Sequence, residues 1–183
     1  AHVGWFTRRA AACVGDAGLV LAYEPDPRNF ACLTQAATHI PNVRLANAAV
    51  VGTAAPGGAV LLMNEQITAG HSRFFGAPES RKIIVPAVTL AQVTDPLPRV
   101  DFIKIDIEGS EAEVLENSRA LLMRLRPHMA IEVDFSGARI GPVLDSLGYD
   151  VVACGLVVDE HPTSEGRALS QGIWYASPKE ART

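Results

Sequence analysis

Cysteine, positive charge and long apolar runs are all scarce in this chain, and each scarcity argues against a class of protein. The three cysteines, Cys13, Cys32 and Cys154, are odd in number and show neither C-x-x-C nor Cys/His ligand spacing, which argues against a disulfide framework and against a zinc site. No apolar run approaches the roughly 20 residues of a membrane span, and no signal peptide is present. A reducing, cytoplasmic setting fits this composition best.

The balance of charge is slightly acidic. The 183 residues carry 16 Lys and Arg against 20 Asp and Glu, a formal net charge of -4, and the basic residues are scattered along the chain. Such a surface has no basic field that would attract a polyanion, so nucleic-acid binding is disfavoured. Internal repeats, linkers and low-complexity tracts are absent as well, so we expect residues 1–183 to form a single domain with a sizeable core.

Strands and helices alternate in a βαβ rhythm, which is typical of a mainly parallel sheet with helices on both faces. Helices are expected over residues 5–14, 27–40, 114–125 and 140–147. Strands are expected over residues 19–23, 43–46, 60–63, 83–88, 100–107, 129–133, 149–154 and 172–176, the last of them antiparallel. The first helix has no preceding strand, capping segment or initiator Met, so we expect that the chain was cut upstream.

The most informative segment is V-D-F-I-K-I-D-I-E-G-S-E-A, residues 100–112. Its apolar run predicts a parallel strand covered on both faces, yet Lys104 and Asp106 interrupt it. Buried ionic side chains are costly unless they are paired or functional. Because ligands bind outside the carboxyl ends of such strands, Asp106 and Glu108 mark a candidate active-site edge. An ordinary strand-to-helix junction, with Glu108 favoured by the helix dipole, explains the same residues and stays open at this point.

Two further strand ends carry polar side chains, Glu24 and Asn47. An acid at the end of the second strand of a nucleotide-binding sheet typically holds the ribose hydroxyls. Glu24 lies about 20 residues after Gly4, which is the spacing of that fingerprint. By itself this signal is weak, because the Glu-Pro-Asp-Pro segment that starts at Glu24 is also a good turn and helix start.

Taken in order, the segments A-H-V-G-W-F-T, A-Y-E-P-D-P-R-N-F, N-A-A-V and V-D-F-I-K-I-D-I-E-G-S-E resemble the FkbM-type methyltransferases, a branch of the Rossmann-like S-adenosylmethionine-dependent enzymes. The resemblance runs from Ala1 to about Val133, and K-I-D-I-E-G-S-E is its most specific piece. Members of that family begin with a strand reading roughly V-D-x-G-A, and this chain starts at the Ala. The resemblance therefore implies an α/β, Rossmann-like class I methyltransferase sheet, mostly parallel, that lacks its first strand here.

The resemblance also implies roles for individual residues. Ala1, His2 and Gly4 correspond to the surviving rim of the cofactor loop, and Glu24 to the acid that holds the ribose diol. Asn47 and Ala48 are implied to lie beside the adenine. Asp106 is implied to face the methionine end of the cofactor and the reacting methyl, with Glu108 close by. Known members methylate hydroxyl groups, often on sugars or polyketide-like natural products, so an S-adenosylmethionine-dependent O-methyltransferase is the leading hypothesis.

A hydroxyl needs a proton acceptor before it attacks a methyl group. The candidates are Asp106, Glu108, Glu132 and His71, with the first two favoured, Glu132 expected as the partner of Lys104 across adjacent strands, and His71 expected on a solvent-facing loop. A divalent metal held by Asp106, Glu132 and Asp134 is the less favoured route, so no metal ligand is assigned. His128 and His161 are expected at the surface.

Two rival functions stay open from sequence alone. A nicotinamide-dependent oxidoreductase would also place Glu24 on a ribose, but no further G-x-G-x-x-G and no catalytic Tyr/Lys pair appears. A non-catalytic interaction module that kept the fold is the other rival. Residues 64–81 are expected to shape the pocket for a small-molecule or glycan acceptor, whose identity the sequence does not disclose. Oligomeric state is open as well.

Overall fold

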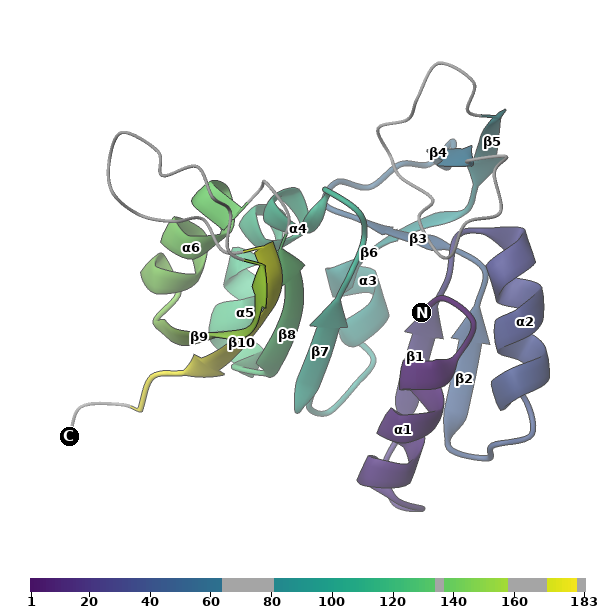
Figure 1. Ribbon diagram of the computed structural model, residues 1–183, viewed down its shortest axis with the longest axis horizontal. Coiled ribbons are helices and arrows are strands. Elements are labelled where there is room, and N and C mark those ends of the chain that lie inside the picture. The colour runs from purple at the N-terminus through teal and green to yellow at the C-terminus, as the bar shows by residue number, and fades with distance from the viewer. Residues whose placement is uncertain (64–80, 134–136, 158–170, 181–183) are drawn as a thin grey trace. The chain divides into compact units, whose positions relative to one another are not determined.

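The computed structural model describes residues 1–63, 81–133, 137–157 and 171–180. The chain divides into two compact units, Ala1–Val88 and Thr89–Thr183, which are described separately below. Figure 1 shows the elements of each unit along the chain. The division does not test the expectation that residues 1–183 form a single domain, which stays a prediction.

Unit 1 begins with two helices and a parallel pair of strands. Helix α1 (Trp5–Val14) leads into β1 (Val20–Tyr23), and helix α2 (Pro27–Ala37) leads into β2 (Val43–Ala46). Strand β1 pairs with β2 in parallel, with Val20 opposite Val43 and Tyr23 opposite Ala46. The core between these elements contains Ala11, Ala22, Leu33, Ala37 and Val43. These elements confirm the predicted helix 5–14 and strand 43–46, whereas the second helix ends at Ala37 rather than near Ile40.

Local sequence explains where these helices start. Asp26 is the N-cap of α2 and accepts a hydrogen bond from the backbone N–H of Arg28 at 2.8 Å, while Pro27 occupies the first turn, as expected from the sequence. Helix α1 has Gly4 at its N-cap in a left-handed conformation with φ 94°, which glycine adopts without the steric cost of a side chain.

The remaining strands of unit 1 are short. Strands β3 (Ala49–Val51) and β6 (Ala87–Thr89) pair with each other, and β4 (Ala59–Met63) pairs with β5 (Arg81–Val85) in antiparallel register. The single strand predicted over 83–88 is wrong, because Pro86 separates β5 from β6. Proline has no N–H for a strand ladder, and the carbonyl of Pro86 accepts instead from the N–H of Ala49 at 2.8 Å.

Unit 2 is built on a four-stranded sheet in the order β7-β8-β10-β9. Strand β7 (Phe102–Ile105) pairs with β8 (His128–Val133) in parallel, and β10 (Gln171–Pro178) is antiparallel to both β8 and β9 (Tyr149–Val157). Helix α6 (Gly137–Ser146) packs against β9 and against α4 (Glu111–Asn117), which also contacts β8. Buried side chains fill the space between them, including Leu115, Met129, Ile131, Ile140 and Leu144.

Three sequence expectations in unit 2 need correction. The single helix predicted around 114–125 is two helices, α4 and α5 (Arg119–Leu125), separated at Ser118. Helix α3 (Leu90–Thr94), which Thr89 caps, was not predicted. Strand β7 lacks the continuous burial expected of a strand covered on both faces: it is an edge strand of its sheet in unit 2, with Ile105 buried and Phe102 44% exposed. The antiparallel β10 is confirmed.

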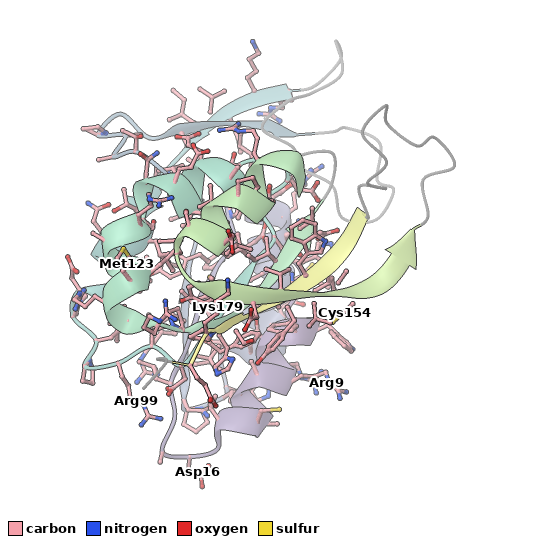
Figure 2. All side chains as sticks on the ribbon, turned by 90° about the vertical axis from the view of Figure 1, so that its left-hand side faces the viewer. Arg9, Asp16, Arg99, Met123, Cys154 and Lys179 are labelled. Carbon is pink, nitrogen blue, oxygen red and sulfur yellow. The ribbon has the colours of Figure 1, made fainter. Side chains whose placement is uncertain are left out.

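Taken together, the described elements form a mixed α/β fold. Parallel pairs occur at β1–β2 and β7–β8, but the sheets are small and mixed, so the mostly parallel sheet expected from the sequence is not confirmed. Side chains at the surface include Met123 on α5 and Cys154 on β9 (Figure 2). Within the described ranges, none of the helices has the length and hydropathy needed to cross a bilayer.

Candidate functional site

In unit 2, acidic side chains gather at the carboxyl ends of β7 and β8. The two strands run parallel with Ile105 opposite Ile131, so the next residues, Asp106 and Glu132, lie side by side. Asp106 and Glu132 share a side-chain hydrogen bond, and the ammonium of Lys104 forms an ion pair with Asp106. Asp106 thus contacts both Lys104 and Glu132, the two residues that the sequence led us to expect as partners across adjacent strands.

The two carboxyl groups hold their protons differently. The hydrogen bond to Asp106, together with burial and the negative charge of Asp106, raises the pKa of Glu132 to about 7. Burial acts to raise the pKa of Asp106, but hydrogen bonds from Glu132 and Lys104 and the charge of Lys104 outweigh it, so this pKa is lowered. Two adjacent carboxylates resist simultaneous ionisation, so around pH 6 Glu132 carries the shared proton and donates it to ionised Asp106.

The turn after Asp106 has an unusual backbone. Glu108 and Gly109 both have positive φ, at 56° and 101°, and the left-handed region costs a residue with a side chain about 1–2 kcal/mol. Glu111, in the first turn of α4, stabilises this turn: Oε1 accepts from the N–H of Ile107 and Oε2 from the N–H of Gly109, both at 2.9 Å. Glu111 is only 3% exposed. Glu111 is the last residue of the K-I-D-I-E-G-S-E segment, but the sequence alone indicated no role for it.

In unit 1, Glu24 directly follows β1, and its buried carboxylate holds the loop before α1. Its Oε2 accepts from the N–H of His2 at 2.6 Å and from the Ala1 ammonium at 3.1 Å, while Oε1 accepts from the N–H of Asp26 at 3.0 Å. The structure thus brings together three residues that the sequence predicted for one site, Ala1, His2 and Glu24.

Asn47 and Gly4 support this arrangement from two sides. The Asn47 side-chain amide donates to the carbonyls of Glu24 at 2.7 Å and Pro25 at 3.1 Å, so it fixes the end of β1. A Cβ on Gly4 would lie 3.0 Å from Leu33 Cδ1 and 3.2 Å from Ala36 Cβ, so only glycine brings the loop this close to α2. Ala48, the other residue expected beside an adenine, is buried next to Asn47.

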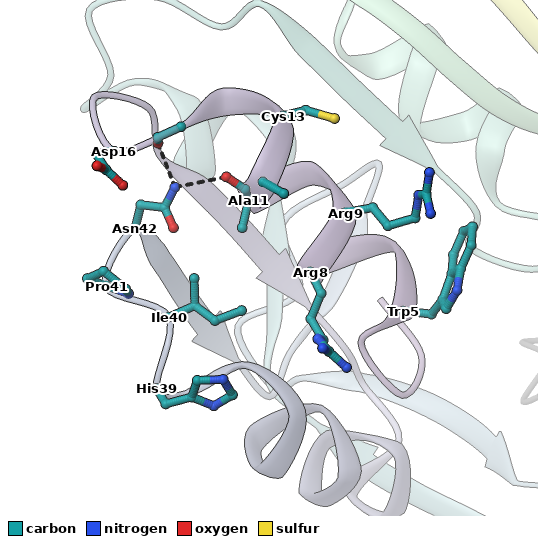
Figure 3. Close-up of a pocket in the computed structure, with 12 residues that line it drawn as sticks. Trp5, Arg8, Arg9, Ala11, Cys13, Asp16, His39, Ile40, Pro41 and Asn42 are labelled. Atoms are coloured by element: carbon teal, nitrogen blue, oxygen red, sulfur yellow. Dashed lines mark hydrogen bonds between the residues drawn. The ribbon is translucent and has the colours of Figure 1, made fainter.

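A groove in unit 1 runs along α1 and the loop before β2 (Figure 3). Trp5 carries the guanidinium of Arg9 over its ring at 5.2 Å, and Asn42 donates to the carbonyls of Ala11 and Gly15 at 3.2 and 2.7 Å. None of the residues predicted from the sequence to bind a cofactor lines this groove. The Asn42 side-chain amide is occupied in holding the end of α1, so the groove is not the candidate site.

Some predicted residues cannot be placed. His71, most of the 64–81 segment, Asp134 and His161 lie outside the described residues. Within the described ranges, no group of three or more His, Cys, Asp or Glu side chains is arranged to hold a metal ion. His128 is exposed as expected, with its Nδ1 2.6 Å from the hydroxyl of Tyr175.

Comparison with known proteins shows which family the chain belongs to. Residues 1–152 match the sequence model of the methyltransferase FkbM domain. A crystal structure of methyltransferase FkbM from Methylobacillus flagellatus KT is similar, with a TM-score of 0.52 and 16% identity over 96% of this chain and 42% of that chain. A precorrin-6y C5,15-methyltransferase from Geobacter metallireducens GS-15 also matches, with a TM-score of 0.44 and 16% identity over 87% of this chain and 65% of that chain.

The chain spans 42% of the length of the Methylobacillus structure, and at this identity the similarity supports the fold alone. No curated protein matched the chain.

Proposed function

Because the chain belongs to the FkbM methyltransferase family, we propose that it is an S-adenosylmethionine-dependent O-methyltransferase that acts on a hydroxyl group of a sugar or natural product. The observation that carries the proposal is the family match over residues 1–152. The acid pair at the ends of β7 and β8 supports it, because methylation of a hydroxyl requires a group that accepts its proton.

The residues of unit 1 fit the donor chemically. A carboxylate has about four acceptor positions, and the Glu24 carboxylate uses three of them on N–H donors, which leaves one on Oε1 for a ribose hydroxyl. Glu24 would hold the ribose, Asn47 would keep Glu24 in place, and Ala48 would lie against the adenine. When bound, S-adenosylmethionine supplies the methyl group: the acceptor oxygen bonds to the methyl carbon, and the sulfur keeps the electron pair of the bond that breaks.

In unit 2, Glu132 is the best proton acceptor. A catalytic base works best when its pKa lies near the working pH, and the pKa of Glu132 is raised to about 7. Asp106 is held ionised and orients Glu132 through their hydrogen bond. In its ionised form Glu132 accepts the hydroxyl proton, which leaves the oxygen with the electron pair that attacks. The negative charge of Glu108 also raises the pKa of Glu132, and it therefore favours transfer of the hydroxyl proton to the Glu132 carboxylate.

The proposal is tested by binding. Calorimetric and thermal-shift titrations of the chain with S-adenosylmethionine, S-adenosylhomocysteine and NAD should show binding of the first two only. A ligand at 100 times its Kd stabilises a protein by about 2.7 kcal/mol, which raises the Tm of a chain of this size by about 5–10 °C. NAD binding instead would favour the oxidoreductase, and binding of none of the three would favour a non-catalytic interaction module.

A pair of variants locates the site. Glu24→Gln should weaken S-adenosylhomocysteine roughly tenfold or more, because the neutral amide offers one acceptor oxygen in place of a carboxylate. Glu113→Gln removes the same charge from an exposed position on α4 and should leave affinity unchanged. Equal affinities of both variants and the wild type would remove Glu24 from the site.

A further inference from the structure

The K-I-D-I-E-G-S-E segment contains a third acid, Glu111, whose contacts differ from those of Asp106 and Glu108. It is buried at 3% exposure, and both of its carboxylate oxygens accept backbone N–H groups, from Ile107 and from Gly109, each at 2.9 Å. These two amides lie on either side of Glu108. The Glu111 carboxylate therefore bridges the turn. We call its two hydrogen bonds, to the amides of Ile107 and Gly109, the Glu111 bracket.

The turn needs such a bracket because its backbone conformation is unfavourable. Glu108 has a side chain and yet adopts φ 56°, and Gly109 follows at φ 101°. Non-glycine residues hold a left-handed conformation only when surrounding contacts impose it. Ser110, at the N-cap of α4, makes no side-chain capping hydrogen bond, so Glu111 is the side chain that ties this turn to the helix.

The bracket also decides where the candidate catalytic carboxylates lie. Ile107 directly follows Asp106, so fixing the Ile107 amide fixes the point at which the chain leaves β7 and keeps Asp106 beside Glu132. Glu108 is held between the two fixed amides. Glu111 itself is too enclosed to meet an acceptor molecule, and its two oxygens are already engaged.

We propose that Glu111 is a positioning residue, which holds the left-handed Glu108–Gly109 turn and thereby keeps Asp106 and Glu132 in contact. Its consequence for catalysis rests on the proposed function, whereas its consequence for the geometry of the turn does not. The two can therefore be measured separately.

The test compares Glu111→Gln with Glu113→Gln in the full chain. Gln at position 111 replaces one acceptor oxygen by an N–H group that faces a backbone N–H. Amide hydrogen exchange at Ile107 or Gly109 should accelerate by roughly tenfold or more, the size expected for losing a hydrogen bond to a charged acceptor. Glu113 lies in the same turn of α4 but is exposed, so Glu113→Gln should change neither amide.

A second readout follows the carboxyl groups. The pKa of Glu132 is raised to about 7 chiefly by its hydrogen bond to Asp106. NMR titration of the side-chain carboxyl carbons should therefore show this pKa falling toward its usual range in Glu111→Gln and staying near 7 in Glu113→Gln. A residue that merely stabilised α4 would lower the melting temperature without moving the pKa of Glu132.

Several outcomes would overturn the proposal. Unchanged exchange at both amides, an unchanged Glu132 titration in Glu111→Gln, or the same changes in Glu113→Gln would each do so. Should Glu111→Gln fail to fold, Gly109→Ala perturbs the same turn, because φ 101° strains any side chain there, and it should lower the pKa of Glu132 as well. Fast exchange of the Ile107 and Gly109 amides in the wild type would refute the bracket directly.

Activity separates this proposal from the function on which it rests. If both NMR readouts change as expected and the wild type methylates no hydroxyl acceptor, the positioning role stands and the proposed function fails. If the wild type is active, Glu111→Gln should lower kcat at least tenfold while the calorimetric affinity for S-adenosylhomocysteine stays within twofold, because the residues proposed to hold its ribose and adenine lie in unit 1.

Discussion

The acidic side chains at the ends of β7 and β8 and in the first turn of α4 differ in protonation and in hydrogen-bond partners. Lys104 keeps Asp106 ionised, Asp106 keeps a proton on Glu132, and Glu111 is engaged by two backbone amides. Each state follows from the partner rather than from the residue type. The cluster therefore contains an ionised acceptor, a proton carrier with a pKa near neutrality and a structural carboxylate within a few residues of sequence and one adjacent strand.

Stability should depend on pH through Glu132. Its folded pKa, about 7, lies above the usual 4.5, so its contribution to the free energy of unfolding is complete below about pH 4.5 and is lost as pH rises through 7. Gln at position 132 keeps a hydrogen-bond donor toward Asp106 without titrating. Between pH 5 and 8 the Tm of the wild type should therefore fall relative to that of Glu132→Gln, by on the order of 2 °C after allowance for solvent screening.

Asp106 affects the pH dependence of stability in the opposite direction and causes the loss of stability at low pH. Its folded pKa is lowered, so its contribution is present above its unfolded value and is lost as pH falls through the folded value. Melting curves from pH 3 to 9, with Glu113→Gln as the control for an exposed acid, check both limbs. A Tm difference between the wild type and Glu132→Gln that is constant from pH 5 to 8 would contradict the shared proton.

Lys104→Met should move the pKa of Glu132 opposite to Glu111→Gln. The Lys104 charge lowers the pKa values of both Asp106 and Glu132, so its removal should raise both. Because Glu132 must be ionised to accept a proton, the acidic limb of the activity profile should shift to higher pH. Folding should tolerate the change, because Asp106 and Glu132 can still share one proton. Carboxyl NMR titration checks the shift, and a lowered Glu132 pKa in Lys104→Met would refute the ion pair with Asp106.

At the level of elements, the loop that leads into α1 depends on Gly4. Gly4→Ala should destabilise the protein in two ways, by about 1–2 kcal/mol for the left-handed backbone and by a further 1 kcal/mol or more, on the order of overpacking, for contact with Leu33 and Ala36. Gly148 also has a positive φ, at 72°, but a Cβ there would contact only the Arg126 guanidinium, at 3.5 Å and beyond, so Gly148→Ala carries the backbone cost alone.

Gly57 completes the series as the control. It has neither a positive φ nor a neighbour within 4 Å, so Gly57→Ala should stay within about 0.5 kcal/mol of the wild type. Urea denaturation of the three variants checks the expected order of stability, with Gly57→Ala the most stable and Gly4→Ala the least. If Gly148→Ala and Gly4→Ala were equally destabilised, close packing against α2 would not constrain this loop.

Much of the element order could be predicted, because caps and apolar patterns are local signals. Asp26 and Pro27 are signals for the start of α2, and a glycine at 15 or 18 is a signal for the end of α1, which lies at Gly15. The break at Ser118 could not be predicted, because Leu115, Leu121 and Leu122 continue the apolar pattern across it and the break lies in the backbone alone, with φ -103° and ψ 11° at Ser118. Nor was Pro86 read as a strand break, although it separates β5 from β6.

The candidate site was predictable as a set of residues and not as a set of contacts. Strand ends placed Asp106 and Glu132 together, since residues after parallel strands meet at one edge. Burial of Glu111 and the left-handed turn at Glu108 depend on backbone geometry that no residue pattern in the segment specifies. A carboxylate two residues after a turn glycine is the one signal that could have directed attention to Glu111.

For the whole molecule, the family match ends before the fold of unit 2 does. The match covers residues 1–152, yet β10 (Gln171–Pro178) lies between β8 and β9 and bonds to both. A chain that stops at Val152 should therefore lose unit 2, with loss of near-UV circular dichroism from Tyr149 and a much lower denaturation midpoint. A chain that stops at Glu180 keeps β10 and should match the wild type. Equal midpoints for the two truncated chains would contradict this role of β10.

The position of β10 also has a consequence for synthesis. Strand β8 ends at Val133 and its neighbour in the sheet starts at Gln171, so on the ribosome, at roughly 5–20 residues per second, one edge of β8 waits a few seconds for its partner. During that interval the edge presents unpaired N–H and C=O groups to any extended segment nearby. The edge of β8 is thus exposed to mispairing after β8 is made and before β10 emerges. A chaperone that covers the edge would protect the nascent chain during this interval, and slowed translation would lengthen it.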